Sequence, residues 1–95
     1  MPLREELKLE TVLQALGDPL RLELVRRIAA SGELACGNAS EGLDVPKSTL
    51  AHHFKVLRQA GVITTRPEGT QGINALRRTD LDTRFPGLLD AILTR

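Results

Sequence analysis

Residues 38–78 read NASEGLDVPKSTLAHHFKVLRQAGVITTRPEGTQGINALRR, and this stretch decides the fold. It predicts a short helix, a tight turn, a longer helix that opens at about Pro46, and a β-hairpin. Gly61 ends the longer helix, because glycine readily adopts the left-handed conformation that closes a helix. This order is typical of a helix-turn-helix over about residues 38–60 and a wing over about residues 62–78, with a reading helix and a basic ribbon on one side.

The two faces of the long helix differ in chemistry. Leu50, Phe54 and Leu57 are spaced four and three residues apart and form one apolar stripe. The opposite face carries only polar and cationic side chains, namely Ser48, His52, Lys55 and Gln59. Such a face is ordinarily just solvated. Here it begins with residues 47–49 at the helix N-terminus, where backbone N–H groups and the dipole attract phosphate, so we favour a surface that faces DNA.

Composition and charge are those of one ordinary globular domain over residues 1–95. The chain is 41% apolar and 26% charged, and it has two aromatic residues, too few for a platform that stacks single-stranded nucleic acid. The net charge of +1 does not by itself indicate nucleic-acid binding, but the distribution of charges along the chain is informative. Between residues 46 and 78 there are six cations and one acid, Glu68. A basic middle with more acidic ends suits a binding face with dimerisation elements behind it.

The segments outside this stretch predict helices. Residues 4–16 form an amphipathic helix that stops at Gly17, and Asp18 caps the next helix, with Pro19 in its first position. That second helix ends near Ala30. The remaining expectations are a link at residues 33–37, a third helix capped by Asn38, strands at 62–66 and 73–77, and a last segment at 80–94 that becomes helical near Pro86. The fold class is mainly α with a small β-hairpin: four helices, the hairpin and a final helix.

The first and last helices carry apolar stripes that need a surface to cover them. They either wrap the core of their own chain or pack across a twofold axis, and we favour a homodimer. The residues expected at this interface are Leu9, Val12, Leu13, Leu88, Leu89 and Ile92.

Cys36 is the only cysteine, which excludes an internal disulfide and is compatible with a reducing cytoplasm. The N-terminal residues MPLREELKLE do not resemble a signal peptide, and no apolar run approaches the roughly twenty residues needed to cross a bilayer. We therefore expect a soluble cytoplasmic protein. For Cys36 itself we favour a small buried residue beside Leu34; the alternative is an exposed redox sensor.

Two ordered motifs resemble the ArsR/SmtB family of bacterial winged-helix repressors. ALGDPLRL at residues 15–22 is similar to the family's A-L-G-D-P-T-R, and KSTLAHHFKVLRQAGVI at residues 47–63 is similar to its recognition helix, S-T-V-S-x-H-L-x-x-L-x-x-A-G-L-V. The resemblance extends over nearly the whole chain. It implies a dimer paired through the first and last helices. It also implies recognition helices in successive major grooves of a near-palindromic operator, with wings at the flanking minor grooves.

The resemblance assigns roles to individual residues. Ala51 stands where the family usually has serine, which makes a thymine-methyl contact possible. His53 lies at the edge of the apolar stripe and is expected to be a structural histidine with a hydrogen bond, whereas His52 is expected to be exposed. The residues expected to bind DNA are Lys47, Ser48, Thr49, Ala51, His52, Lys55 and Arg58 on the helix, and Arg66, Gln71 and Arg77 in the wing.

The metal sites of that family lack their ligands in this sequence. The family's E-L-C-V-C run aligns with residues 33–37, where Ala35 and Gly37 take the two ligand positions and Cys36 falls between them. A soft-metal site needs two to four converging thiolates. The second family site has the pattern D-x-H followed by H-x-x-E. In this sequence Asp82 stands at the position of the first histidine, and Leu93 lies near the position of the second. We expect no metal and no other cofactor, and the sequence does not identify an inducer.

These observations favour a sequence-specific DNA-binding transcriptional regulator that acts as a repressor. The alternative is a protein–protein interaction module on the same scaffold, because a fold does not fix a function. An enzyme is not expected, since the sequence shows no Ser-His-Asp or Cys-His arrangement, no paired carboxylates suited to a cleft, and no glycine-rich phosphate loop.

Overall fold

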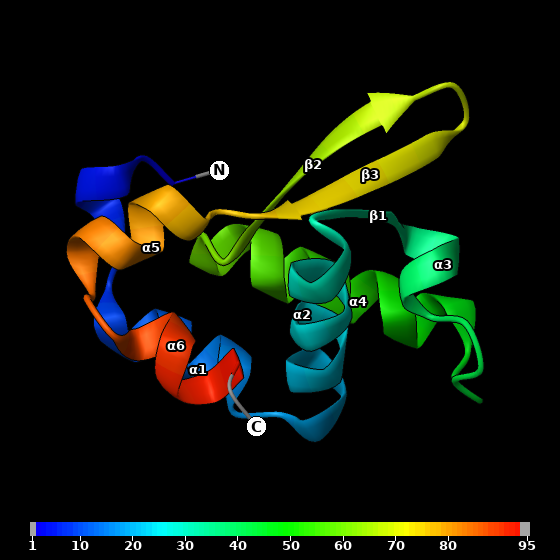
Figure 1. Ribbon diagram of the computed structural model, residues 1–95. Helices are drawn as coiled ribbons and strands as arrows, with labels where there is room; N and C mark the ends of the chain where they lie inside the picture. Colours follow the sequence, from blue (N-terminus) through cyan, green and yellow to red (C-terminus); the bar gives the residue numbers. More distant parts are fainter. Residues whose placement is uncertain (1, 94–95) are drawn as a thin grey trace.

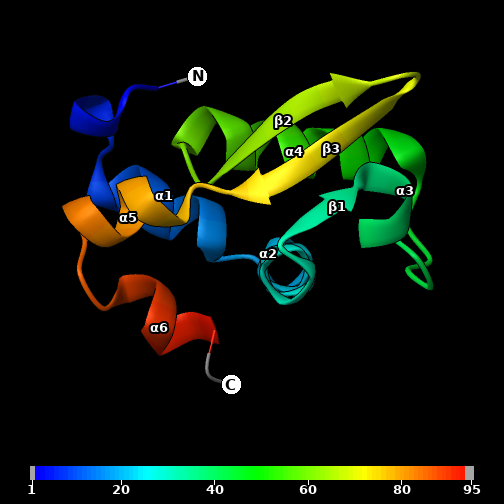
Figure 2. The same cartoon turned by 45° about the horizontal axis from the view of Figure 1, so that its top comes forward.

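The computed structural model describes residues 2–93 and orders its elements around the long helix α4 (Figure 1). The elements are a 3₁₀ turn η1 (Arg4–Glu6), α1 (Leu9–Leu16), α2 (Pro19–Ser31), β1 (Glu33–Ala35), α3 (Cys36–Ala39), α4 (Lys47–Ala60), β2 (Ile63–Glu68), β3 (Gln71–Leu76), α5 (Arg78–Arg84) and α6 (Leu88–Leu93). Helices α1, α5 and α6 gather at one end, while α3 and the tip of the hairpin lie at the other (Figures 1 and 2). The terminal helices and the tip of the hairpin therefore lie at opposite ends of the molecule.

The helix signals read from the sequence hold at α2 and α4. Asp18 Oδ2 accepts a hydrogen bond from the Arg21 backbone N–H at 3.0 Å, and Pro19 is the first helical residue. Gly61 closes α4 in the left-handed conformation, with φ +86°. The first helix is shorter than predicted. Residues 4–6 form a separate 3₁₀ turn because Leu7 leaves the helical path and is 1% exposed in the core.

The predicted hairpin is present, and a third strand joins it. Strands β2 and β3 pair antiparallel from Ile63↔Leu76 to Glu68↔Gln71. Residues 33–35, predicted as part of a link, form β1 on the other side of β3. The third helix begins at Cys36 after Ala35, so the prediction that Asn38 caps it is wrong. A three-residue strand is too short to show an alternating pattern, and only its partner strand reveals it.

The C-terminal segment is two helices where one was predicted. α5 begins at Arg78, before Pro86, and its Leu81 is fully buried. Proline has no backbone N–H and its ring clashes with the preceding turn, so α5 ends at Arg84 and the chain turns through Pro86 and Gly87 into α6. The predicted helix near Pro86 corresponds to α6, which begins at Leu88, and the prediction missed α5, which has already ended before Pro86.

The core lies between α2, α4 and the base of the sheet. Its fully buried side chains include Leu24, Ile28, Leu57 and Ile63. Asn74 is the one buried polar residue among residues 2–93, and it ties the sheet together. Its amide nitrogen donates to the Leu34 carbonyl at 3.2 Å and to Cys36 Sγ at 3.1 Å, while its oxygen accepts from Thr65 Oγ1 at 2.7 Å. The base of the hairpin is thus fixed to β1 and α3.

The six residues predicted at a dimer interface divide into three pairs by their burial. Val12 and Leu89 are 0% exposed and pack in the core of their own chain. This is one of the two alternatives that the amphipathic pattern allowed. Leu9 and Leu13 are 44% and 48% exposed on α1, and Leu3 nearby in the chain is 60% exposed. Leu88 and Ile92 are half-buried. The large apolar side chains still uncovered among residues 2–93 are therefore Leu9 and Leu13 on α1 and Leu3, which precedes η1.

Candidate nucleic-acid interface

One face of α4 is exposed, polar and positively charged. All six helix residues that the family resemblance pointed to are exposed, namely Lys47, Ser48, Thr49, Ala51, His52 and Lys55. Arg58 is half-buried on the next turn, and no acidic residue occurs in the helix. Phe54 and Leu57 on the other face are buried, so the core fixes which side of α4 points outward. The two periodic faces predicted from the sequence are both present.

The N-terminus of α4 is open for an anion. Pro46 precedes the helix, and no side chain caps it. The first backbone N–H groups of a helix have no partner within the helix, and the helix dipole adds a partial positive charge at the same end. The backbone N–H groups of residues 47–49 therefore lie next to the exposed side chains, which is the arrangement that binds phosphate groups.

His53 connects the helix-turn-helix to the rest of the chain. Its Nδ1 lies 3.1 Å from Arg21 Nη1, and Arg21 Nε donates to the Ala15 carbonyl at 2.6 Å. An arginine only donates, so His53 accepts at Nδ1 and carries its proton on Nε2. The prediction of a structural histidine is confirmed. The sequence did not identify its partner, because Arg21 lies 32 residues away on α2.

The three wing residues have different surroundings. Gln71 is exposed at the start of β3. Arg66 is also exposed, but its guanidinium binds Glu68 at 2.6 Å and Glu33 at 2.9 Å; these hydrogen bonds, that to Glu68 first, raise its pKa further. The side chain of Arg77 is only 9% exposed. Of the three, Gln71 alone extends from the hairpin without a carboxylate partner among residues 2–93.

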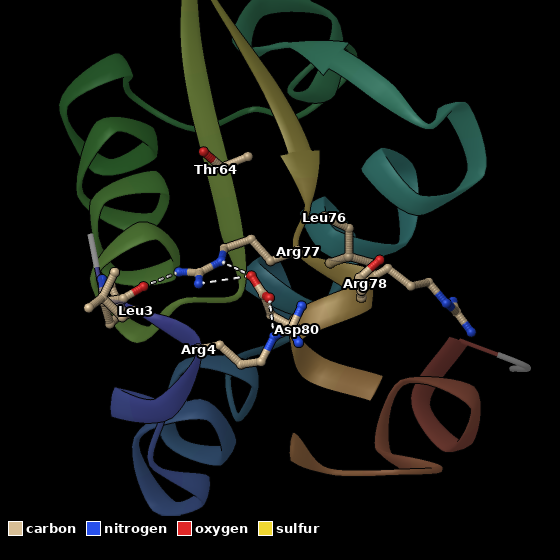
Figure 3. Close-up of a pocket in the computed structure, with 9 residues that line it drawn as sticks. Leu3, Arg4, Thr64, Leu76, Arg77, Arg78 and Asp80 are labelled. Carbon is tan, nitrogen blue, oxygen red and sulfur yellow. Dashed lines mark hydrogen bonds and ion pairs between the residues drawn. The ribbon is translucent and has the colours of Figure 1, made fainter. Parts of the chain in front are cut away.

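Arg77 and Asp80 instead form a cluster at the base of the wing (Figure 3). Arg77 donates to Asp80 Oδ2 from Nε at 3.1 Å and from Nη2 at 3.0 Å, and its Nη1 donates to the Pro2 carbonyl at 2.7 Å. Arg4 Nε donates to the other oxygen of Asp80 at 2.6 Å. The hydrogen bonds from Arg4 and then Arg77 lower the pKa of Asp80 below its ordinary value. The cluster fastens the N-terminal segment to the junction of β3 and α5.

Comparison with known proteins identifies the type of helix-turn-helix. A family described as "Helix-turn-helix domain" matches residues 16–66, from the end of α1 into the wing. The HTH-type transcriptional regulator YceK of Bacillus subtilis is 37% identical over 82 residues, which are 85% of this chain and 82% of that protein. The arsenical resistance operon repressor of Staphylococcus xylosus is 35% identical over 79% of this chain and 71% of that protein. The chain belongs to the ArsR/SmtB family. It is a DNA-binding transcriptional regulator, and the resemblance of its two motifs to this family is confirmed.

The fold agrees with that of solved structures, among them the ArsR family transcriptional regulator RHA00566, which superposes with a TM-score of 0.74 and 22% identity over 87% of this chain and 90% of that chain. Reduced HlyU from Vibrio cholerae N16961 superposes with a TM-score of 0.70 and 26% identity, over 90% of this chain and 88% of HlyU. The winged helix-turn-helix predicted from the sequence is therefore confirmed, with β1 as an addition to it. Within this ArsR-family chain, no helix among residues 2–93 combines the length and the apolar character needed to cross a membrane.

The candidate metal positions of this ArsR-family chain lie apart from one another. Among residues 2–93 no group of three or more His, Cys, Asp or Glu side chains comes close enough to hold a metal ion. Cys36 is half-buried, with its sulfur held by the Asn74 amide. Asp80 and Asp82 both form ion pairs with arginines.

Replacing Asp80 with asparagine is expected to lower the melting temperature at neutral pH, because two charge-assisted hydrogen-bond partners lose their carboxylate. The pKa of Asp80 is lower in the folded state than in the unfolded state. Its contribution is therefore present above the pKa of a free aspartate, about 3.9, and is lost as the pH falls through the lower folded value. Thermal unfolding from neutral pH down to about pH 3 should show the two proteins converging in acid. A gap that is constant at every pH would contradict an electrostatic origin.

Proposed function

We propose that this chain is a dimeric transcriptional repressor that binds a near-palindromic operator in double-stranded DNA. α4 enters the major groove, Lys47, Lys55 and Arg58 contact phosphates, and Ser48, Thr49 and His52 meet base edges. Ala51 faces a thymine methyl group, and Gln71 at the wing reaches the flanking minor groove. Arg66 contacts a phosphate of the DNA after it gives up its carboxylate partners. Arg77 stays paired with Asp80 at the base of the wing and does not contact DNA.

The observation that carries this proposal is that three cations on one helix, α4, have no carboxylate partner in the part of the chain that the structure describes. Arg4, Arg27, Arg66, Arg77 and Arg78 each bind a carboxylate within the chain. Lys47, Lys55 and Arg58 form no ion pair within residues 2–93, and no acid shares their helix. Cations without a partner on an exposed helix, beside an uncapped helix N-terminus, are complementary to a row of phosphates.

Fluorescence anisotropy tests the proposal directly. The protein is titrated into a labelled duplex from the region upstream of its own gene and into a scrambled duplex, each at two salt concentrations. Tighter binding to the native duplex and an affinity that falls steeply with salt are expected. Weak and equal binding to both duplexes contradicts a local operator. The exposed face of α4 would then be assigned to a protein partner, and a pull-down would follow.

The dimer rests on the exposed leucines at the end opposite the hairpin tip. Leu9 and Leu13 form an exposed apolar patch on α1, and α1, α5 and α6 lie at the same end of the molecule in Figures 1 and 2. Leu88 and Ile92 of α6 border the core. A second copy packed there across a twofold axis covers the patch and leaves both α4 helices free.

Replacing Leu9 and Leu13 together with aspartate is expected to weaken dimerisation by more than about a hundredfold, because two apolar side chains become charges at the interface. Both positions are exposed in the single chain, so the fold is expected to survive. Sedimentation velocity over a concentration series measures the change, and circular dichroism checks the helix content. A variant that remains dimeric at wild-type concentrations would place the interface elsewhere.

Replacing His52 with alanine is expected to narrow the gap between operator and random DNA by about tenfold, since one good base contact contributes about 1–3 kcal/mol. Lys55→Ala is the matched comparison, because it removes a neighbouring exposed side chain that contacts phosphate and should weaken binding to both duplexes alike. The anisotropy titrations provide both ratios. Equal losses on the two duplexes for His52→Ala would remove His52 from the reading residues.

A further inference from the structure

A groove of about 340 Å³ separates α3 from α4. Both ribbon views show α3 beside the N-terminal part of α4 (Figures 1 and 2). Its floor is apolar and is formed by Leu50 and Phe54 of α4 together with the half-buried thiol of Cys36. Gly37 lines the α3 side. The groove is thus an apolar channel built between the two helices of the helix-turn-helix.

Two cations line this groove, and no acid does. Lys47 and Arg58 lie eleven residues apart on α4, which corresponds to about 16 Å along the helix axis. Neither forms an ion pair within residues 2–93. The lining therefore combines an apolar floor with positive charge toward both ends.

An apolar floor beside two cations is more than contacts with DNA phosphates require. A phosphodiester needs the cations but gains nothing from Leu50, Phe54 and the Cys36 thiol, which prefer an apolar occupant. We propose that the groove binds a small monocarboxylic acid with a hydrocarbon body, such as a medium-chain fatty acid. The hydrocarbon lies on the apolar floor, and the carboxylate pairs with Arg58 or Lys47 through charge-assisted hydrogen bonds.

Such a ligand would oppose DNA binding, and this consequence rests on the proposed function. Lys47 and Ala51 belong both to the groove and to the face assigned to DNA. A bound carboxylate neutralises a cation that would otherwise contact phosphate, and the hydrocarbon occupies space beside Ala51. The acid therefore binds the free protein better than the DNA complex, which is the property of an inducer.

Calorimetric titration of the full chain with decanoate, in the absence of DNA, tests the site itself. Gly37→Leu fills the groove from α3: a Cβ at Gly37 meets no atom within 4 Å, and its φ is not in the left-handed region. We expect this variant to fold normally and to bind decanoate at least about tenfold more weakly. Arg58→Gln should also weaken binding, by about tenfold. The matched control is Arg78→Gln, which removes an exposed arginine on α5 and should leave the affinity unchanged.

The probes also separate this site from simple anion attraction. Acetate carries the same carboxylate without the hydrocarbon, and it should not compete with decanoate at equal concentration. Absence of decanoate binding below its micelle concentration, full binding by Gly37→Leu, or equal binding of acetate would each overturn the proposal. Anisotropy titrations with the operator then distinguish a failure of the inducer role from a failure of the proposed DNA-binding function. DNA binding that decanoate does not change contradicts the inducer role alone, whereas absence of DNA binding without any ligand contradicts the proposed function.

Discussion

Replacing Lys47, Lys55 and Arg58 together with alanine is expected to weaken operator binding by about a hundredfold at physiological salt. Each cation that neutralises a phosphate releases a counterion and adds about 0.9 to the slope of log affinity against log salt, so three contacts add about 2.7. These cations have no carboxylate partner within residues 2–93, so their charge is free for phosphate. Titrations at several salt concentrations should show a slope that is shallower by this amount.

The control removes three positive charges outside α4, at Arg26, Arg78 and Arg84, and each of these arginines also loses a hydrogen bond to a carbonyl or a carboxylate. It changes the net charge equally, so it shows how much of the loss comes from the overall charge of the protein. We expect less than about tenfold weakening from it, because charges beyond the Debye length of about 8–10 Å are largely screened. If the control and the α4 variant lose affinity equally, the DNA-facing role of α4 is refuted. Thermal unfolding confirms that both variants are folded.

The part of the site on α4 was predictable because it depends on one helix. A stripe of Leu50, Phe54 and Leu57 fixes the buried side, and the helical repeat then places His52 and Lys55 outside. The limits of α4 were equally local, since Gly61 has a conformation that only glycine adopts easily. Local rules therefore predicted α4, its C-terminal end and its exposed face.

The remaining features depend on contacts between distant parts of the chain. Strand β1 forms because Leu34 pairs with Asn74, forty residues later. Three residues are too few to show the alternating pattern by which a strand is predicted from sequence. Arg77 looked like Arg66 in the sequence, but the carbonyl of Pro2 and the carboxylate of Asp80 hold it at the base of the wing. An amphipathic stripe shows that a side chain will be covered, and it does not show by what. For that reason Val12 was assigned to a partner subunit, and it packs in its own core.

Gly61→Ala is expected to destabilise the protein by about 2–4 kcal/mol. Its φ of +86° disfavours any residue with a Cβ, by about 1 kcal/mol or more. A Cβ there would lie 2.1 Å from Cδ2 of Leu7, a core side chain that is 1% exposed, so Leu7 must shift within the core. Overpacking of this kind adds about 1–3 kcal/mol. For a domain of this size the melting temperature should fall by roughly 10–30 °C.

Gly32→Ala separates the two causes. Gly32 closes α2 with a similar φ of +82°, although its ψ of −58° differs from the 16° of Gly61, and a Cβ there meets no atom within 4 Å, so only a backbone cost of about 1 kcal/mol or more is expected. The excess loss in Gly61→Ala measures the contact with Leu7, and equal melting temperatures for the two variants would refute it. Gly61 also sets the angle between α4 and the wing, because Val62 donates back to the Leu57 carbonyl at 3.0 Å across it. Operator affinity measured well below the melting temperature should therefore fall in Gly61→Ala and remain at the wild-type level in Gly32→Ala, since only the first change moves the wing relative to the reading helix.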